Sequence, residues 1–268
     1  MNGTCAPAQL RARLRAGDFL LGTHIHANDP TLTELLGQRG FDYLWIDTEH
    51  TAIDYQTLQL HLLAARAAGC PALVRVPWNE SYLVKRVLDQ GADGVIFPMI
   101  RSVQEAREAL SSCLYPPAGS RSYGPIRAAG YGAQALSDYI GGAEQSFLRL
   151  LQIEHVDAVA CLPEILALPG LDGLILGPCD LSGSAGLLGD MAHPRVQALL
   201  AQTISACRDA GIPVGVSLGA CGAEAVLAWK ARGVQMVSAH SEYSYVLQGA
   251  EQLVRGVRND TARQDTVG

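Results

Sequence analysis

A chain of 268 residues with 49% hydrophobic residues and 28 glycines suits one globular domain of alternating strands and helices. A net charge of −6 with scattered basic residues argues against a nucleic-acid groove, and no apolar run reaches the ~20 residues of a membrane helix. The seven cysteines are far apart with no Cys-x-x-Cys pair, which predicts reduced thiols in a cytoplasmic protein rather than disulfides or a zinc site.

Short apolar runs alternate with helical segments along the chain. The first segment carries Arg11, Arg13 and Arg15, which we expect on the solvated face of an opening helix. Eight apolar runs predict strands over 19–25, 42–46, 72–76, 94–97, 149–153, 173–176, 214–217 and 236–238. The clearest helices between them cover 55–68, 81–90, 103–114 and 194–210.

Eight strands that alternate with helices are the number required for a closed barrel. We therefore predict an α/β protein with a single-domain (β/α)8 TIM barrel over residues 1–258, including a C-terminal helix. A frayed polar tail is expected over 259–268. No internal repeat beyond the strand and helix alternation is evident.

One connection, over 115–142, is too long and irregular for a simple turn. A loop of this length is either disordered or functional. Its arginines and tyrosines favour an ordered loop near an anionic site or a subunit interface. These residues are Arg121, Tyr123, Arg127 and Tyr131.

Polar side chains gather where the predicted strands end. In chain order they are Asp47, Glu49, His50, Arg75, Gln152, Glu154 and Asp180. The carboxyl ends of parallel barrel strands meet on one face, which is the active face of such barrels. Each residue also has a structural interpretation, because a strand arginine is often half of a buried ion pair and an aspartate often caps a helix. The convergence of several such groups favours an active site.

Glu154 and Asp180 have no cysteine or histidine ligand close by in the predicted arrangement, which favours a hard divalent cation such as Mg²⁺ or Mn²⁺. A site with open positions could bind a 2-oxo acid through its carboxylate and keto oxygens. Arg75 could then stabilise charge on the keto oxygen, and His50 could move protons. The two lysines, Lys85 and Lys230, lie in helical patterns, which argues against a Schiff base.

Motifs spread over nearly the whole chain carry a family resemblance. They are GFDYLWIDTEH (40–50), LVRVP (73–77), LDQGADGVIFP (88–98), YPPAGSRSYGPIRAAGYG (115–132), LLQIEH (150–155) and LPGLDGLILGPCDLS (168–182). With this spacing the chain resembles the metal-dependent (class II) pyruvate aldolases of the HpcH/HpaI family, such as 4-hydroxy-2-oxoheptanedioate aldolase and 2-dehydro-3-deoxy sugar-acid aldolases. The broader group includes the citrate lyase β subunit.

The resemblance implies a divalent-metal-dependent aldehyde-lyase that reversibly cleaves a 4-hydroxy-2-oxo acid to pyruvate and an aldehyde, through a metal-stabilised pyruvate enolate. It implies that Glu154 and Asp180 hold the metal, which could be Mg²⁺, Mn²⁺ or Co²⁺. Arg75 and Gln152 would contact the pyruvyl group, and His50 would act as acid and base.

The resemblance also implies Asp47 as the partner that orients His50, with Asp89 as a second candidate that could act across a subunit boundary. Backbone N–H groups around Gly177, Pro178 and Cys179 would hold the substrate carboxylate, although Pro178 itself has no donor. Relatives assemble as hexamers with exchanged C-terminal helices, so a homo-oligomer is expected.

The chain departs from the family pattern at several positions. Thr51 and Ser122 stand where relatives often have glycine, and Cys179 stands in place of a usual alanine. His24 and His26 stand where relatives often have a tryptophan or small polar residues. Either histidine could reach the aldehyde end or serve a structural purpose, so the aldehyde is left open.

Two alternatives remain at this point. A carbon–carbon lyase or synthase that acts on an acyl-CoA or on oxaloacetate would share the same metal and enolate chemistry. It would need a basic surface for the CoA phosphates, and the loop with Arg121 and Arg127 is the one candidate. A barrel that has lost catalysis would have lost Glu154, Asp180 or Arg75, and all three are present.

Overall fold

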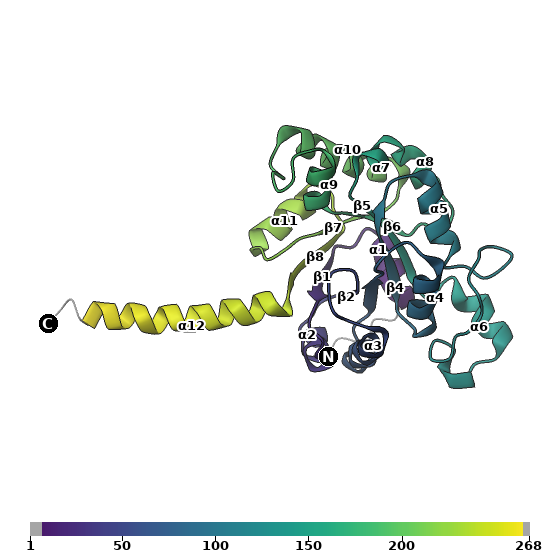
Figure 1. Cartoon of the computed structure of the whole chain (residues 1–268), viewed down its shortest axis with the longest axis horizontal. Helices are drawn as coiled ribbons and strands as arrows, with labels where there is room; N and C mark the ends of the chain where they lie inside the picture. The colour runs from purple at the N-terminus through teal and green to yellow at the C-terminus, as the bar shows by residue number, and fades with distance from the viewer. Residues whose placement is uncertain (1–6, 265–268) are drawn as a thin grey trace.

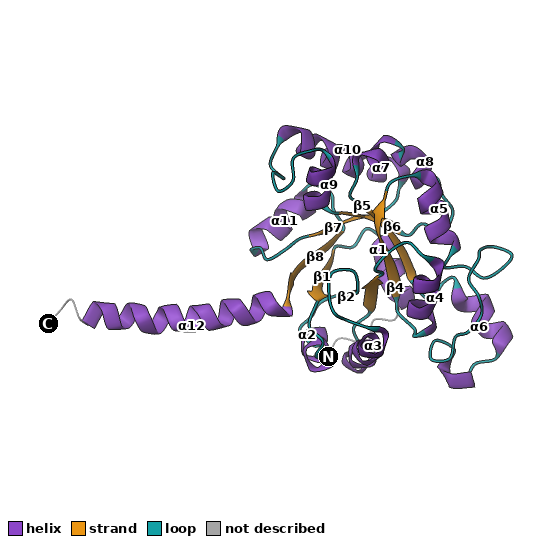
Figure 2. Ribbon diagram, viewed as in Figure 1, coloured by secondary structure: helices purple, strands orange, loops and turns teal. Residues whose placement is uncertain are grey.

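The computed structural model describes residues 7–264, and its centre is a closed barrel of eight parallel strands in sequential order (Figure 2). The strands are β1 (Leu20–Ile25), β2 (Tyr43–Asp47), β3 (Ala72–Arg75), β4 (Gly94–Ile100), β5 (Leu148–Ile153), β6 (Gly173–Leu176), β7 (Val214–Ser217) and β8 (Met236–Ser241). The (β/α)8 barrel and all eight predicted strands are therefore confirmed.

Helices follow the strands and surround the barrel (Figure 1). They are α1 (Pro7–Arg15), α2 (Pro30–Gly37), α3 (Tyr55–Ala68), α4 (Ser81–Asp89), α5 (Val103–Ser111), α6 (Leu136–Ala143), α7 (Val156–Ala160), α8 (Leu162–Leu166), α9 (Pro178–Ser184), α10 (Pro194–Ala210), α11 (Ala223–Ala231) and α12 (Glu242–Gln264), with a short 3₁₀ turn at Gly130–Gly132. Helices α3 and α10 have the predicted bounds, and each ends at a glycine in the left-handed conformation.

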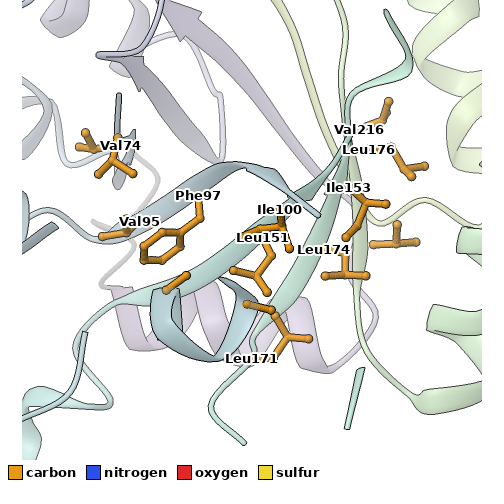
Figure 3. Close-up of a cluster of buried hydrophobic side chains, with 14 of the residues drawn as sticks. Val74, Val95, Phe97, Ile100, Leu151, Ile153, Leu171, Leu174, Leu176 and Val216 are labelled. Atoms are coloured by element: carbon orange, nitrogen blue, oxygen red, sulfur yellow. The ribbon is translucent and has the colours of Figure 1, made fainter. Parts of the chain in front are cut away.

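The core has two layers because successive strand residues point to opposite faces. Inward-facing side chains such as Trp45, Leu73 and Ile96 fill the barrel, and Leu10 and Leu14 of α1 join this inner cluster. Outward-facing side chains such as Val95 and Leu174 pack between the strands and the surrounding helices (Figure 3). The barrel is therefore a filled core, and its chemistry is confined to the strand ends.

Helix α1 closes the end of the barrel where the strands begin. Arg11 is buried, and its guanidinium binds the Asp172 carboxylate at 2.9 Å and the backbone oxygen of Phe147. Arg15 also reaches Asp172, at 3.2 Å, and Arg13 pairs with Asp42 at 2.7 Å. The expectation that these arginines form a solvated face is wrong for Arg11, because α1 packs beneath the barrel and brings this residue to a buried acid.

The same turn precedes every even-numbered strand, a repeat that was not predicted. A glycine with positive φ is followed two positions later by a side chain that accepts a backbone N–H from the start of the preceding strand. The glycines are Gly40, Gly91, Gly170 and Gly233, and the acceptors are Asp42, Asp93, Asp172 and Gln235. Asp93 also lines a cavity of about 560 Å³ at this end of the barrel, which contains none of the predicted site residues.

The long connection over 115–142 is ordered by its two buried arginines. Arg121 binds the Asp89 carboxylate at 2.7 Å and stacks 4.7 Å from the Tyr115 ring centre. Arg127 donates hydrogen bonds to the backbone oxygens of Gln90 and Leu62. Both guanidinium groups fasten the loop to its own barrel, as an ordered loop requires, and its place near an anionic site or a subunit interface stays a prediction.

Helix α12 leaves the barrel instead of folding back against it (Figure 1). Its large exposed apolar side chains recur at helical spacing along one stripe, formed by Tyr243, Val246, Leu247, Leu253 and Val254. The helix extends to Gln264, so the domain boundary predicted at residue 258 falls inside it, and 265–268 lie outside the described residues. No described helix is both long enough and apolar enough to cross a membrane.

Candidate active site

The pairing of β2 with β3 places Asp47 beside Arg75 at the carboxyl ends of both strands. The Arg75 guanidinium donates two parallel hydrogen bonds to Asp47, from Nε to Oδ1 at 2.9 Å and from Nη2 to Oδ2 at 2.7 Å. Although burial alone would raise it, the pKa of Asp47 is lowered by Arg75 and by the N–H of Glu49. Asp47 therefore holds the plane of the Arg75 guanidinium fixed at the barrel mouth.

Glu49 lies between the arginine and His50. Its Oε2 atom is 2.9 Å from Arg75 Nη1, at ion-pair distance but without hydrogen-bond alignment, and 3.7 Å from Nε2 of the exposed His50 ring. Burial raises the pKa of Glu49 to about 7, and the charges of Asp47 and Asp180 add to this effect against the opposing charge of Arg75. Glu49 can therefore exchange a proton near neutral pH.

Glu154 follows directly after β5 and is buried. Its Oε1 accepts a hydrogen bond from Gln152 Nε2 at 2.7 Å, and its Oε2 accepts one from the Met99 backbone N–H at 3.0 Å. Burial raises the pKa of Glu154 to about 7, with a further contribution from Asp180, while the Met99 hydrogen bond acts in the opposite direction. The carboxylate is oriented by neutral donors and has no cation in hydrogen-bond contact within 7–264.

The end of β6 brings Asp180 towards Glu154. A Cβ atom at Gly177 would collide with the Glu154 carboxylate, so glycine is required where α9 begins. Pro178 is the first residue of α9, and the exposed Asp180 lies in its first turn. The charge of Asp180 raises the pKa values of both Glu49 and Glu154, so the three acids influence one another at the barrel mouth.

This arrangement fits a divalent cation held by few protein ligands. Glu154 and Asp180 concentrate negative charge, while the nearby Arg75 is bound to Asp47. Among the described residues there is no cluster of three or more side chains that could by itself hold a metal. Two carboxylates would leave several coordination positions for water and substrate, as hard oxygen-seeking cations require in open sites.

The predicted site residues fall into two groups by their contacts. Asp47 and Arg75 form one connected set, and Gln152 and Glu154 form another that packs against Gly177. The predicted pairing of Asp47 with His50 remains a prediction: the hydrogen-bonded partners given by the structure for Asp47 are Arg75 and the Glu49 N–H. Asp89 is paired with Arg121 of its own loop, and its role across a subunit boundary also remains a prediction.

Two contributors were not identified from the sequence as site residues. Glu49 was noted beside His50 but given no role, and its contacts with Arg75 and His50 were not foreseeable from spacing alone. Met99 has positive φ at an irregularity between β4 and β5, which turns its N–H towards Glu154. The only signal in the sequence was Pro98 within an otherwise apolar strand, which is typical of a bulge.

Comparison with known proteins places this site in a family. A family model described as HpcH/HpaI aldolase/citrate lyase matches residues 20–244. The chain is 35% identical over 243 residues to 2-dehydro-3,6-dideoxy-6-sulfogluconate aldolase of Pseudomonas putida, covering 90% of this chain and 94% of that protein. It is 37% identical over 206 residues to 4-hydroxy-2-oxo-heptane-1,7-dioate aldolase of Shigella sonnei, covering 77% and 79%.

The fold agrees with these sequence matches. A crystal structure of a family protein from Burkholderia cenocepacia superposes with a TM-score of 0.88 at 33% identity, covering 94% of this chain and 99% of that one. The family model spans the barrel from β1 to the start of α12 and therefore includes every residue of the site. This chain belongs to the HpcH/HpaI aldolase/citrate lyase family.

Proposed function

We propose that this protein is a divalent-metal-dependent aldolase that reversibly cleaves a 4-hydroxy-2-oxo acid into pyruvate and an aldehyde. Its relatives are named as aldolases, and the chain is an aldehyde-lyase of this family. The observation that carries the proposal is the convergence of Glu154 and Asp180 beside the fixed guanidinium of Arg75. This arrangement suits a substrate with two adjacent oxygens, one of which gains negative charge.

The cation would be held by Glu154 and Asp180, and Mg²⁺, Mn²⁺ and Co²⁺ all suit such oxygen ligands. When bound, it would supply Lewis-acid polarisation of the 2-oxo acid. The hydrogen bonds from Gln152 and Met99 to Glu154 would keep its carboxylate directed at the mouth. Neutral donors are suited to this purpose because they leave the negative charge of the ligand intact.

Arg75 would stabilise the charge that develops on the keto oxygen of pyruvate. Nε and one hydrogen of Nη2 are bound to Asp47, and Nη1 lies 2.9 Å from Glu49, so the second hydrogen of Nη2 remains for another acceptor. The Asp47 pair fixes its direction before substrate arrives, and preorganised donors lower a barrier more than mobile ones. Gln152 lies beside Glu154 on the same face and would contact the pyruvyl group.

His50 would remove the proton from the C4 hydroxyl, directly or through water, so that the C3–C4 bond can break. Its ring is exposed at the mouth and lies 3.7 Å from Glu49. Glu49, whose pKa is raised to about 7 mainly by burial, could orient the ring and accept or return a proton. Asp47 would act on His50 through Glu49, whose backbone N–H it binds at 3.0 Å.

The substrate carboxylate would bind at the start of α9. The first-turn N–H groups of a helix have no partner within the helix, and Pro178 removes one of them. The N–H groups of Cys179 and the residues after it would remain for the carboxylate. Gly177 would allow the backbone to approach Glu154 closely enough for one ligand to contact both.

The protein would work as a homo-oligomer, with a hexamer as the expected form by family resemblance. The exposed apolar stripe of α12 supports this proposal, because such a stripe needs a partner to cover it. A second copy of the chain is the proposed partner, with α12 packed against the neighbouring barrel. Among the described cysteines, Cys113, Cys161, Cys179, Cys207 and Cys221 are thiols, which supports a location in the cytoplasm.

The acyl-CoA or oxaloacetate alternative is less well supported than the aldolase function. Its acyl-CoA form would need the basic loop to bind the phosphates of CoA, whereas Arg121 is paired with Asp89, and Arg127 is bound to backbone oxygens of its own barrel. The relatives at 35% to 37% identity are named as aldolases. The aldolase function is therefore preferred.

The deciding experiment is pyruvate release from a panel of 4-hydroxy-2-oxo acids, coupled to lactate dehydrogenase, with EDTA or with added Mg²⁺ or Mn²⁺. We expect release that depends on the metal and disappears in Glu154→Ala. The matched control is Glu164→Ala, which removes an exposed glutamate from α8. Release that is insensitive to EDTA, or that persists in Glu154→Ala, would refute the proposal.

A further inference from the structure

The mouth of the barrel has a second half, formed by the ends of β7, β8 and β1, that the proposed chemistry leaves unused. A buried imidazole, His24, lies there on the inward face of β1. Its ring centre is 5.2 Å from that of Trp45, and 5.6 Å from that of His26. Because the catalytic groups lie on β2, β3, β5 and β6, a substrate that reaches across the mouth from them meets this half.

The hydrogen bonds of His24 determine its tautomer. Its Nδ1 lies 2.8 Å from the backbone oxygen of His240, and a carbonyl oxygen can only accept, so Nδ1 carries the proton. Burial lowers the pKa of His24 to about 4, so the ring is neutral at physiological pH and Nε2 is a bare acceptor. Ser217 Oγ, 3.0 Å from Nε2, must therefore donate its hydrogen to the ring.

The carbonyl that sets this arrangement is itself held in place. His240 has a positive φ of 61°, and its ring stacks on Tyr245 with centres 5.2 Å apart. The same ring contacts the backbone of Cys221 in the loop after β7. The position of the His240 carbonyl is thus fixed by contacts on both sides, and the tautomer of His24 follows from it.

Ser217 consequently presents an acceptor to the mouth. Its only hydroxyl hydrogen is committed to His24, while lone pairs of the half-buried oxygen remain available. Rotating the hydroxyl towards a substrate would leave the buried Nε2 without a donor, which is unfavourable because buried acceptors need a hydrogen-bond partner. A substrate group that donates a hydrogen bond is favoured here over one that only accepts.

The surrounding charges support the same selection. The segments after β1 and β7, over 26–29 and 218–222, contain no lysine or arginine. After β8 the chain continues with Glu242, whose buried carboxylate accepts the backbone N–H groups of His26 and Ala27. Within the described part of the chain, these segments therefore offer an anionic substrate group acceptors and no cation, and Arg75, whose charge reaches His24, is already paired with Asp47 and Glu49.

We propose that Ser217, held by His24, selects an aldehyde that carries a hydroxyl group over one that carries a carboxylate or only an alkyl chain. This inference rests on the proposed aldolase function. It assigns a purpose to His24, which the proposed chemistry leaves unused. The Ser217 oxygen accepts the hydrogen of the aldehyde's hydroxyl group, and the hydroxyl of Ser217 remains directed at His24.

The test is the aldol addition of pyruvate to four aldehydes by the metal-loaded enzyme: glycolaldehyde, glyceraldehyde, propionaldehyde and succinic semialdehyde. We expect the two hydroxyaldehydes to have the highest kcat/KM. Ser217→Ala should lower their kcat/KM about tenfold, the usual effect of one neutral hydrogen bond, and leave propionaldehyde unchanged. Equal losses for all four aldehydes, or a native preference for succinic semialdehyde, would overturn the inference.

Controls separate this inference from the proposed function. Ser205→Ala on α10 removes a hydroxyl outside the mouth and should change none of the four rates. Exchange of pyruvate methyl protons with deuterated water needs no aldehyde, so Ser217→Ala should retain it. If the native enzyme lacks this exchange, the aldolase proposal fails and the inference with it; exchange without hydroxyaldehyde preference refutes the inference alone.

A second measurement reads the tautomer of His24 directly in the native protein. Nitrogen-15 NMR of the histidine-labelled protein distinguishes a protonated from a bare ring nitrogen. We expect His24 to show a protonated Nδ1 and a bare Nε2 at pH 7, with the signal assigned by its absence in His24→Gln. A protonated Nε2 would make Ser217 a donor to the mouth and would overturn the inference.

Discussion

Both ends of the barrel pair arginines with acids. At one end the arginines balance the charge of the buried acid, and at the other end they leave part of the acidic charge unbalanced. At the end where the strands begin, the buried Asp172 is bound by Arg11, Arg15 and Arg149, at 2.9, 3.2 and 3.4 Å, and by a backbone N–H. At the end where they finish, Arg75 is shared between Asp47 and Glu49, and Glu154 has only neutral donors.

The difference shows which charges stabilise the fold and which are available for chemistry. The carboxylate of Asp172 is matched by three arginines, so removing this carboxylate leaves the buried Arg11 and Arg149 without their acid. The carboxylates of Glu49 and Glu154 are under-compensated, and burial raises the pKa of each to about 7. An acid whose charge is not balanced by its own chain is ready to bind a cation or a proton.

The largest expected effect comes from removing the unbalanced acid. Glu154→Gln keeps the shape of the side chain but loses a ligand charge, so we expect kcat/KM for aldol cleavage to fall at least about a thousandfold. Glu164→Gln, at an exposed position of α8, should have no such effect. Residual activity above a tenth of the native value would show that Glu154 is not part of the metal site.

The same variant, which should lower activity, should make the stability of the metal-free protein less dependent on pH. The pKa of Glu154 in the folded protein, about 7, lies above its ordinary value of 4.5, so its contribution to stability is present at low pH and lost as pH rises through 7. The metal-free native protein should therefore lose stability from this group between pH 5 and 8. In Glu154→Gln the loss should be smaller, as urea unfolding at both pH values would show.

Arg75→Ala tests the shared arginine. Removal of one preorganised donor from a developing oxyanion typically lowers kcat by roughly a hundredfold to a thousandfold, and we expect a loss in this range. Mn²⁺ binding, measured by calorimetry, should be retained because the proposed metal ligands are the carboxylates of Glu154 and Asp180. Arg107→Ala on the exposed face of α5 is the control, and near-native kcat in Arg75→Ala would contradict the proposed role.

The matching test at the opposite end is Asp172→Asn. Loss of this carboxylate leaves Arg11 and Arg149 buried without their acid, and breaking such a cluster typically costs about 3 to 5 kcal/mol of unfolding free energy. The kcat of the folded fraction should stay close to native, since the site lies at the other end. A large fall in kcat without a change in stability would contradict the structural role assigned to Asp172. Asp209→Asn, on the exposed surface, is the control.

The smallest effect concerns pH and the metal. Because Glu154 must lose its proton to bind a cation, Mn²⁺ affinity should fall about tenfold for each pH unit below its pKa of about 7. Titrations between pH 5.5 and 8.5 would measure this slope. An affinity that does not change over this range would mean that the acids are already ionised without metal.

The fold was largely predictable because each strand and helix has its own local signal. Buried parallel strands appear as apolar runs, and α3 and α10 end at glycines that the backbone requires there. The strand-end acids were predictable for the same reason, since strand direction places Asp47 and Glu154 at one face. Arg11 was not, because its partner, Asp172, is 161 residues away and nothing near Arg11 predicts it.

Other features depend on backbone geometry that residue types alone do not predict. The N–H of Met99 reaches Glu154 only because β4 is irregular at its end. The contacts of Glu49 depend on how the chain turns after β2, which spacing does not specify. The direction of α12 was also beyond local prediction, because an amphipathic helix can cover its own barrel or another surface equally well.

The first residue of α12 links that helix to the mouth of the barrel through hydrogen bonds. Glu242 begins the helix, and its carboxylate holds the backbone N–H groups of His26 and Ala27 where β1 ends. The His26 ring lies 3.8 Å from Asp47, the residue that fixes Arg75. If α12 packs on a second copy of the chain as proposed, that contact would also hold Glu242 and the end of β1 in place. Subunit assembly and the position of Arg75 would then be coupled, and dilution would weaken both.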